Sequence, residues 1–124
     1  MAVEEGTIVA ALRAAGALFG YLHGSQVGGT PRPDSDLDVA AHFGGRTPAA
    51  WEVPVPPDVD LLVLDDAPLY LAGRIAVRGR LLFDDDPSAR VVWEANTRTM
   101  YLDELPYIEH MTREYLQAVA RGRR

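Results

Sequence analysis

The sequence predicts an α/β domain with a small mixed sheet flanked by helices and with a C-terminal helical pair. Three observations predict this class. Short apolar segments with strand character alternate with longer segments of helical periodicity. Glycine, proline and aspartate mark the boundaries between the segments. The length of 124 residues suits one hydrophobic core and is too short for two, so we expect a single domain over residues 1–124.

The first part of the chain predicts one helix and two strands. Residues 3–15 carry apolar side chains at helical spacing and end at a glycine, a common helix stop. Residues 17–23 are apolar and fit a buried strand, after which Gly24 allows the backbone to turn. A polar loop follows, and residues 37–43 form the second strand.

The second part begins with a proline-rich connection, residues 46–57, in which we expect at most one helical turn. Asp65 and Asp66 are expected at the positive end of a helix dipole, and Asp86 is expected to cap a long helix. Pro106 predicts a break in that helix. The elements expected here are a strand at 58–64, a helix at 68–78, a strand at 80–83 and a pair of helices within about 87–121.

The stretch from Gly24 to Asp38 carries the chemistry. Gly24 and Ser25 open a glycine-rich loop whose backbone N–H groups and small hydroxyl suit a phosphate. Asp36 and Asp38 lie two residues apart on a strand, so both carboxylates face the same side of the sheet. Their mutual repulsion is relieved by a divalent cation, and oxygen ligands without cysteine favour Mg²⁺. The combination indicates nucleotide chemistry.

Two other interpretations of these aspartates compete with the metal site. Asp34, Asp36 and Asp38 begin like a calcium-binding EF-hand loop, but Val39 stands where that loop needs glycine and Gly45 where it needs glutamate. A simple polar turn before a strand is common, yet it leaves Asp38 unexplained inside an apolar run, where an unpaired carboxylate is costly.

A third carboxylate is needed if two metal ions take part in nucleotidyl transfer. Asp58 and Asp60 are the candidates, because both lie on the same face of the next strand. Asp60 is preferred, since an apolar run follows it, whereas Asp58 adjoins a proline. The acidic triplet 84–86 is interpreted as a solvated capping turn, and His23 and His42 are left out because a hard ion does not favour imidazole.

The pattern Gly24-Ser25, ten residues, Asp36-Leu37-Asp38 resembles the minimal nucleotidyltransferases of the polymerase-beta-like superfamily. The whole chain is similar to the antitoxin (MNT) half of the prokaryotic HEPN/MNT toxin–antitoxin pairs. The resemblance implies the polymerase-beta-like nucleotidyltransferase fold and an acidic residue followed by leucine, here Asp60-Leu61. It also implies two Mg²⁺ ions, ATP as substrate, and transfer of AMP to a tyrosine of a cognate HEPN-domain ribonuclease toxin, with which the chain forms a hetero-oligomer.

Carried over to this chain, the resemblance places Asp36, Asp38 and Asp60 as catalytic and metal-binding residues and Gly24 and Ser25 at the phosphates. One position departs from the family pattern. The loop arginine that usually precedes the next glycine is replaced here by Gly28, which removes a phosphate partner. Arg32 lies in the same loop and is expected to take over this nucleotide contact, and weaker candidates are Arg74 and Arg78.

The composition excludes several classes of partner and site. The net charge of −6 argues against broad nucleic-acid binding, and the absence of cysteine excludes a disulfide framework or a thiolate metal site. No apolar run reaches membrane-spanning length and the first residues lack a signal peptide, so we expect a cytoplasmic protein. Two rivals remain: an antitoxin that acts by binding alone, and a small-molecule nucleotidyltransferase, for which the chain lacks room for an acceptor-binding domain.

The C-terminal third holds more large apolar side chains than one helical face needs. We expect four of them to form a stripe that docks the toxin: Ile108, Met111, Tyr115 and Val119. The alternative is an intramolecular helical hairpin, which would bury the same residues within the chain.

Overall fold

The structure, a computed structural model, describes residues 4–24 and 37–122. Within these residues a four-stranded sheet has the order β3-β2-β1-β4. Short 3-10 turns lie at Ala50–Glu52 and Leu64–Asp66. The helices and strands are α1 (Glu5–Ala14), β1 (Phe19–His23), β2 (Leu37–His42), β3 (Val59–Val63), α3 (Leu69–Arg78), β4 (Arg80–Asp84) and α4 (Pro87–Gly122). The expected α/β class with a mixed sheet is confirmed.

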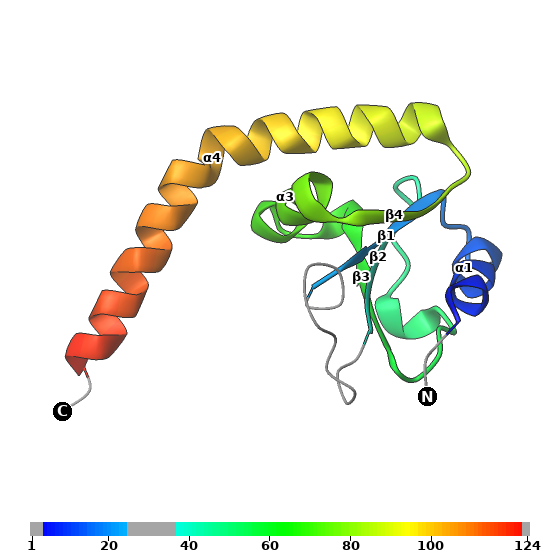
Figure 1. Cartoon of the computed structure of the whole chain (residues 1–124), viewed down its shortest axis with the longest axis horizontal. Helices are drawn as coiled ribbons and strands as arrows, with labels where there is room; N and C mark the ends of the chain where they lie inside the picture. Colours follow the sequence, from blue (N-terminus) through cyan, green and yellow to red (C-terminus); the bar gives the residue numbers. More distant parts are fainter. Residues whose placement is uncertain (1–3, 25–36, 123–124) are drawn as a thin grey trace.

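Strand β1 lies at the centre of the pairing, because it is antiparallel to both β2 and β4. Strand β3 extends the sheet by pairing parallel with β2. Figure 1 shows α1 on one face of this sheet and α3 and α4 on the other. Since β2 and β3 run in the same direction, the first residues of both strands lie at the same end of the sheet.

Alternation along the strands divides the apolar side chains between two cores. Val39 and Ala41 of β2 pack with Ile8 and Leu12 of α1 in the core on one face. Ala40 faces the other way and joins the core that α3 and α4 cover, made of Phe19, Tyr21, Ala40, Leu64, Ala72 and Ile75. By the same alternation, Asp38 and His42, which lie two residues before and after Ala40 on β2, face α3 and α4.

The first half of α4 is tied to the sheet by polar groups as well as by packing. The Tyr21 hydroxyl donates a hydrogen bond of 2.6 Å to a carboxylate oxygen of Glu94. Arg90 donates to the other Glu94 oxygen at 2.9 Å, and Arg98 donates to the carbonyl oxygen of Ala76 on α3 at 2.6 Å. These bonds hold α4 against both β1 and α3.

Two aspartates expected at helix starts behave differently. Asp86 caps α4 as expected, since its carboxylate accepts the N–H of Ala89 at 3.1 Å. Asp65 does not serve the helix dipole. Its carboxylate accepts the backbone N–H groups of Phe43 at 2.8 Å and Gly45 at 2.6 Å, which holds the loop after β2.

The expected C-terminal pair of helices is wrong, because α4 is one helix of 36 residues with Pro106 inside it. Proline removes the hydrogen bond to the carbonyl of Leu102, four residues earlier. Pro106 and Leu102 are both exposed, so water can bind the freed carbonyl. Figure 1 shows α4 bending midway, with its second half pointing away from the sheet. The described residues therefore form no helical hairpin.

Helices α3 and α4 approach closely where they cross. A Cβ at Gly73 would collide with the ring of Tyr101, so only glycine fits at this crossing. None of the helices in the described ranges is both long and apolar enough to cross a membrane.

Candidate functional site

Two of the three predicted carboxylates lie side by side. Asp38 and Asp60 are register partners across the parallel strands β2 and β3. Neighbouring strands are about 4.8 Å apart, so like charges at these positions repel each other. Asp58 precedes β3, and its backbone carbonyl accepts the N–H of Leu37 at 2.9 Å. The geometry thus favours Asp60 over Asp58 as the neighbour of Asp38.

Three other predicted site residues, Ser25, Arg32 and Asp36, lie outside the described residues. Gly24 is described, at the end of β1. Its φ of +78° lies in the left-handed region, which disfavours any residue with a side chain. A Cβ at Gly24 would also collide with the carboxylate of Asp38. The backbone that begins the predicted phosphate loop therefore lies directly against one of the two carboxylates.

His23, which is not expected among the ligands of a hard ion, belongs to the same site. It is the register partner of Asp38 across β1 and β2. Its Nε2 atom is buried and has no hydrogen-bond partner among the described residues. Burial lowers the pKa of His23 below its ordinary value, although the negative charges of Asp38 and Asp60 and a bond with the backbone of Val39 oppose this shift. The imidazole is therefore neutral near pH 7.

Two arginines of α3 face the same place. A pocket of about 300 Å³ is lined by His23 and Gly24 on one side and by α3 on the other. The α3 residues that line it are Leu71, Arg74, Ile75, Arg78 and the following Gly79. Neither Asp38 nor Asp60 lines this pocket, but His23 and Gly24 lie beside Asp38, so the pocket places two positive charges next to the carboxylate site.

The described residues fit a hard cation in part. No group of three or more His, Asp or Glu side chains within residues 4–24 and 37–122 is arranged to hold a metal ion. Asp38 and Asp60 supply two adjacent carboxylates, and Mg²⁺ is usually bound by one or two carboxylates together with substrate phosphates and water. This donor set therefore fits Mg²⁺ once a phosphate is present.

The acidic triplet at the start of α4 has other partners. Asp84 accepts a hydrogen bond from Arg90, Asp85 pairs with Arg13 at 2.7 Å, and Asp86 caps the helix. Each carboxylate has a structural partner, in agreement with the interpretation as a capping turn.

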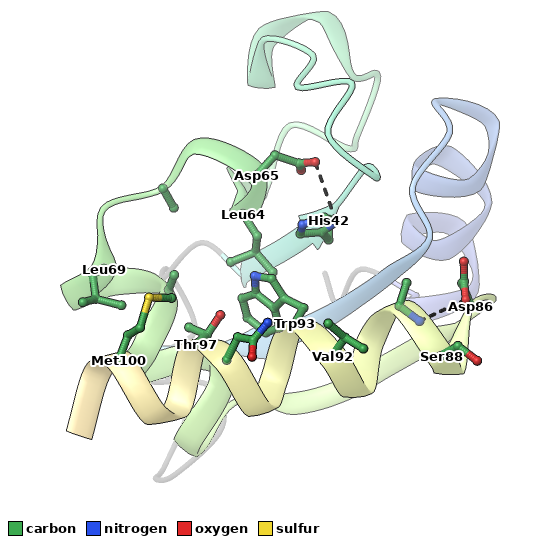
Figure 2. A pocket seen from close by; sticks show the side chains of 14 residues that line it. His42, Leu64, Asp65, Leu69, Asp86, Ser88, Val92, Trp93, Thr97 and Met100 are labelled. Atoms are coloured by element: carbon green, nitrogen blue, oxygen red, sulfur yellow. Dashed lines mark hydrogen bonds and ion pairs between the residues drawn. The ribbon is translucent and has the colours of Figure 1, made fainter. Parts of the chain in front are cut away.

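A larger cavity, of about 840 Å³, lies at the opposite end of the same sheet face. Figure 2 shows Trp93, Thr97 and Met100 of α4 on one side of it and His42 and Asp65 on the other. His42 is held in place by stacking on Phe19, with ring centroids 5.1 Å apart. No arginine or lysine of the described residues lines this cavity, whereas two aspartates do. It is therefore an unsuitable place for a polyphosphate.

Comparison with known proteins gives structural neighbours only. No protein-family model matches the chain, and no curated protein matches it. One neighbour is a chain in the crystal structure of a toxin–antitoxin with AMP-PNP, with a TM-score of 0.74, 23% identity, and coverage of 92% of this chain and 99% of that chain. A toxin–antitoxin MntA-HpeT mutant, with glutamate in place of two aspartates two positions apart, gives a TM-score of 0.74 at 21% identity and the same coverage.

A third neighbour belongs to a solved structure of a tri-AMPylated Shewanella oneidensis HEPN toxin in complex with MNT antitoxin. Its TM-score is 0.66 at 21% identity, over 90% of this chain and 95% of that chain. At these identities the likeness shows a shared fold. The fold that the sequence motif implied is therefore the fold observed.

Proposed function

We propose that this chain is a nucleotidyltransferase antitoxin that moves AMP from ATP to a tyrosine hydroxyl of a cognate HEPN-domain toxin. The observation that carries the proposal is the register of Asp38 with Asp60, directly beside the backbone of Gly24. A carboxylate pair next to a phosphate loop is suited to nucleotidyl transfer. The shared fold with chains of toxin–antitoxin complexes, one of them with an AMPylated toxin, supports the choice of acceptor.

The proposal assigns Asp36, Asp38 and Asp60 as ligands of two Mg²⁺ ions, which would neutralise the triphosphate and acidify the acceptor hydroxyl. Asp38 lies two residues after Asp36 in the sequence and is the register partner of Asp60 on the neighbouring strand. The Asp38 carboxylate would therefore be shared by the two Mg²⁺ ions. One of the neighbours carries glutamate at two aspartates with the spacing of Asp36 and Asp38, which is consistent with a functional pair.

The transfer itself breaks one phosphorus–oxygen bond and forms another. The tyrosine oxygen attacks the α-phosphorus of ATP, and the bond from that phosphorus to the bridging oxygen of the β-phosphate breaks. Pyrophosphate leaves with the electron pair. Asp60, which is exposed at the edge of the site, accepts the proton of the attacking hydroxyl. The backbone of Gly24 and the side chains of Ser25 and Arg32 are assigned to the phosphates.

The partner is assigned to the second half of α4. Met111 is 46% exposed and Tyr115 is 67% exposed, although both are apolar or aromatic. They lie four residues apart, on one face of the helix, together with Ile108 and Val119 of the predicted stripe. Methionine and tyrosine are enriched at protein interfaces, so this face suits a protein partner.

A second candidate function is an antitoxin that neutralises its toxin by binding alone. The exposed face of α4 favours it, because that surface needs no chemistry to act, and so does Gly28 in place of the loop arginine. The carboxylate pair argues against it. A site that had lost its function would have no need to keep two repelling charges in register.

The test is AMP transfer with purified components. The protein is incubated with MgATP and the product of the neighbouring gene, and intact-mass spectrometry detects the addition of AMP. We expect Asp60→Asn to abolish transfer and Asp58→Asn, the same charge change two residues earlier, to retain it. Neutralisation without AMP addition would establish the binding-only antitoxin, and AMP transfer only to a small molecule would establish the third rival.

A further inference from the structure

The pocket beside the carboxylate pair has a positive wall. Of the residues that line it, His23 and Gly24 belong to the site already described, and Arg74 and Arg78 come from α3. Gly24 lies against Asp38, and His23 is the register partner of Asp38, so the arginines face the space next to the site. A volume of about 300 Å³ is at the lower end of the range for small-ligand pockets, about 300–1,000 Å³.

The two arginines share one side of α3. They lie four residues apart, which places them on the same helical face, and both are exposed. The buried residues Ala72, Ile75 and Ala76 face the sheet and α4 instead. Neither arginine belongs to a hydrophobic core, although both also line a groove between α3 and α4.

Several other arginines of the described residues are matched by carboxylates, whereas Arg46, Arg113 and Arg121 resemble Arg74 and Arg78 in forming no ion pair with a described carboxylate. Arg13 pairs with Asp85, Arg80 with Glu5, and Arg90 with Asp84 and Glu94. Within residues 4–24 and 37–122 no carboxylate forms an ion pair with Arg74 or Arg78. Arg78 lies in the last turn of α3, where a cation suits the helix dipole, but Arg74 lies one turn earlier and the dipole does not explain it. In a chain of net charge −6, the two arginines place positive charge next to the negative charges of Asp38 and Asp60.

We propose that Arg74 and Arg78 bind the β- and γ-phosphates of a nucleoside triphosphate, and so hold the pyrophosphate that leaves. The inference rests on the proposed function, because the α-phosphate must lie at the carboxylates where the acceptor attacks. The arginines, on the far wall of the pocket, then meet the two terminal phosphates. A guanidinium group can donate two parallel hydrogen bonds to one phosphate, which suits a site that holds a leaving group.

This subsite explains how the chain dispenses with the loop arginine. The charge that the sequence pattern would place at Gly28 is supplied by α3 instead. A helix that packs on the sheet holds a guanidinium more firmly than a loop does. The larger cavity at the other end of the sheet offers no such alternative, because Asp65 and Asp86 would repel a polyphosphate there.

Calorimetry on the full-length protein with Mg²⁺ tests the subsite. Three ligands are compared: ATP, inorganic tripolyphosphate and AMP. Arg74→Gln and Arg78→Gln are each expected to weaken ATP and tripolyphosphate binding roughly 10- to 100-fold, the equivalent of a lost charge-assisted hydrogen bond, and to leave AMP binding within about twofold. Arg74→Lys should lie between the wild type and Arg74→Gln, because lysine keeps the charge but not the paired donors.

Arg121→Gln is the matched control, since Arg121 is an exposed arginine of α4 that lines neither this pocket nor the groove between α3 and α4 that Arg74 and Arg78 also line. Melting curves establish that each variant is folded. Variants of Arg74 and Arg78 that bind ATP as the Arg121→Gln control does would overturn the subsite, and so would a wild-type protein that binds neither ATP nor tripolyphosphate. A wild type that binds both through these arginines but transfers nothing would overturn the proposed function and leave the subsite in place.

Discussion

Gly24 and Asp38 are packed so closely that the glycine has no room for a Cβ, because this atom would collide with the Asp38 carboxylate. The contact joins the end of β1 to the start of β2 at the point where the predicted phosphate loop begins. The backbone of Gly24 and the carboxylate of Asp38 are thereby brought within reach of the same ligand. The site is consequently sensitive to a single methyl group.

Gly24→Ala is therefore expected to lower the folding free energy by more than the strain of a left-handed backbone alone. Gly45→Ala is the matched control, since Gly45 also has a left-handed φ, of +87°, but nothing lies within 4 Å of an added Cβ. The control should lose about 1–2 kcal/mol of folding free energy, from the left-handed backbone alone. Gly24→Ala should lose more in chemical denaturation. The excess should largely vanish in an Asp38→Ala background, and an excess that persists there would show that the carboxylate is not its cause.

ATP binding should depend on a divalent cation. The triphosphate and the carboxylates of Asp38 and Asp60 are all negative, so they repel each other unless a cation bridges them. Calorimetry in Mg²⁺ or Mn²⁺ should show binding that EDTA removes. The double variant Asp38→Asn with Asp60→Asn should lose the cation-dependent part while its melting temperature stays equal or rises. Equal ATP affinity with and without EDTA in the wild type would contradict the metal assignment.

The Tyr21 phenol should resist ionisation in the folded protein. Burial, the hydrogen bond to Glu94 and the Glu94 charge all raise the pKa of Tyr21 above its ordinary value of 10.0. The folded state thus favours the protonated phenol, so its contribution to stability is complete below pH 10 and is lost as the pH rises further. Ultraviolet titration should show the exposed tyrosines ionising first and Tyr21 ionising only as the protein unfolds.

Tyr21→Phe provides the control for that titration and a measure of the bond. Loss of the hydroxyl should destabilise the protein by about 1–2 kcal/mol, because a partly buried carboxylate loses one donor while Arg90 still binds it. The variant should also lose the late ionisation. A late ionisation that remained would have to belong to one of the other four tyrosines.

Partner binding should depend on the second half of α4 and not on the fold. Met111→Ser with Tyr115→Ser should abolish capture of the neighbouring gene product and leave the melting temperature unchanged, since neither residue belongs to a core. Val91→Ser with Val92→Ser is the matched control, because these side chains are 53% and 60% exposed on the first half of the same helix. Undiminished capture by the Met111 and Tyr115 variant would show that the toxin docks elsewhere.

Much of the fold was predictable because its boundaries are marked locally. Gly16, Gly79, Asp86 and the prolines of 46–57 end or begin elements for reasons that lie within a few residues. The long helix α4 was not predicted, since the cost of Pro106 depends on whether water can reach the freed carbonyl of Leu102. Exposure of that kind is a property of the folded molecule.

The residues of the candidate site also fall into those that the sequence predicts and those that it does not. Asp60 was predictable because its strand and its face follow from alternation. His23 was not, since its position opposite Asp38 depends on the pairing of β1 with β2 across the long segment between them. Asp65 was assigned to a helix start because its partners, Phe43 and Gly45, lie more than a dozen residues away in the sequence. Local sequence patterns predict which face of a strand a residue lies on and which residue caps a helix, but they do not predict the register between strands.

The bend in α4 separates two kinds of evolutionary constraint within one helix. Up to the bend, Trp93 and Glu94 are bound to the sheet, so substitutions there affect folding and the site together. Beyond Pro106 the helix extends for about 25 Å, at 1.5 Å per residue, and contributes to neither core. Substitutions on the exposed face of that outer arm leave both cores unchanged, so a lineage of such chains could remodel this surface while its sheet stays the same.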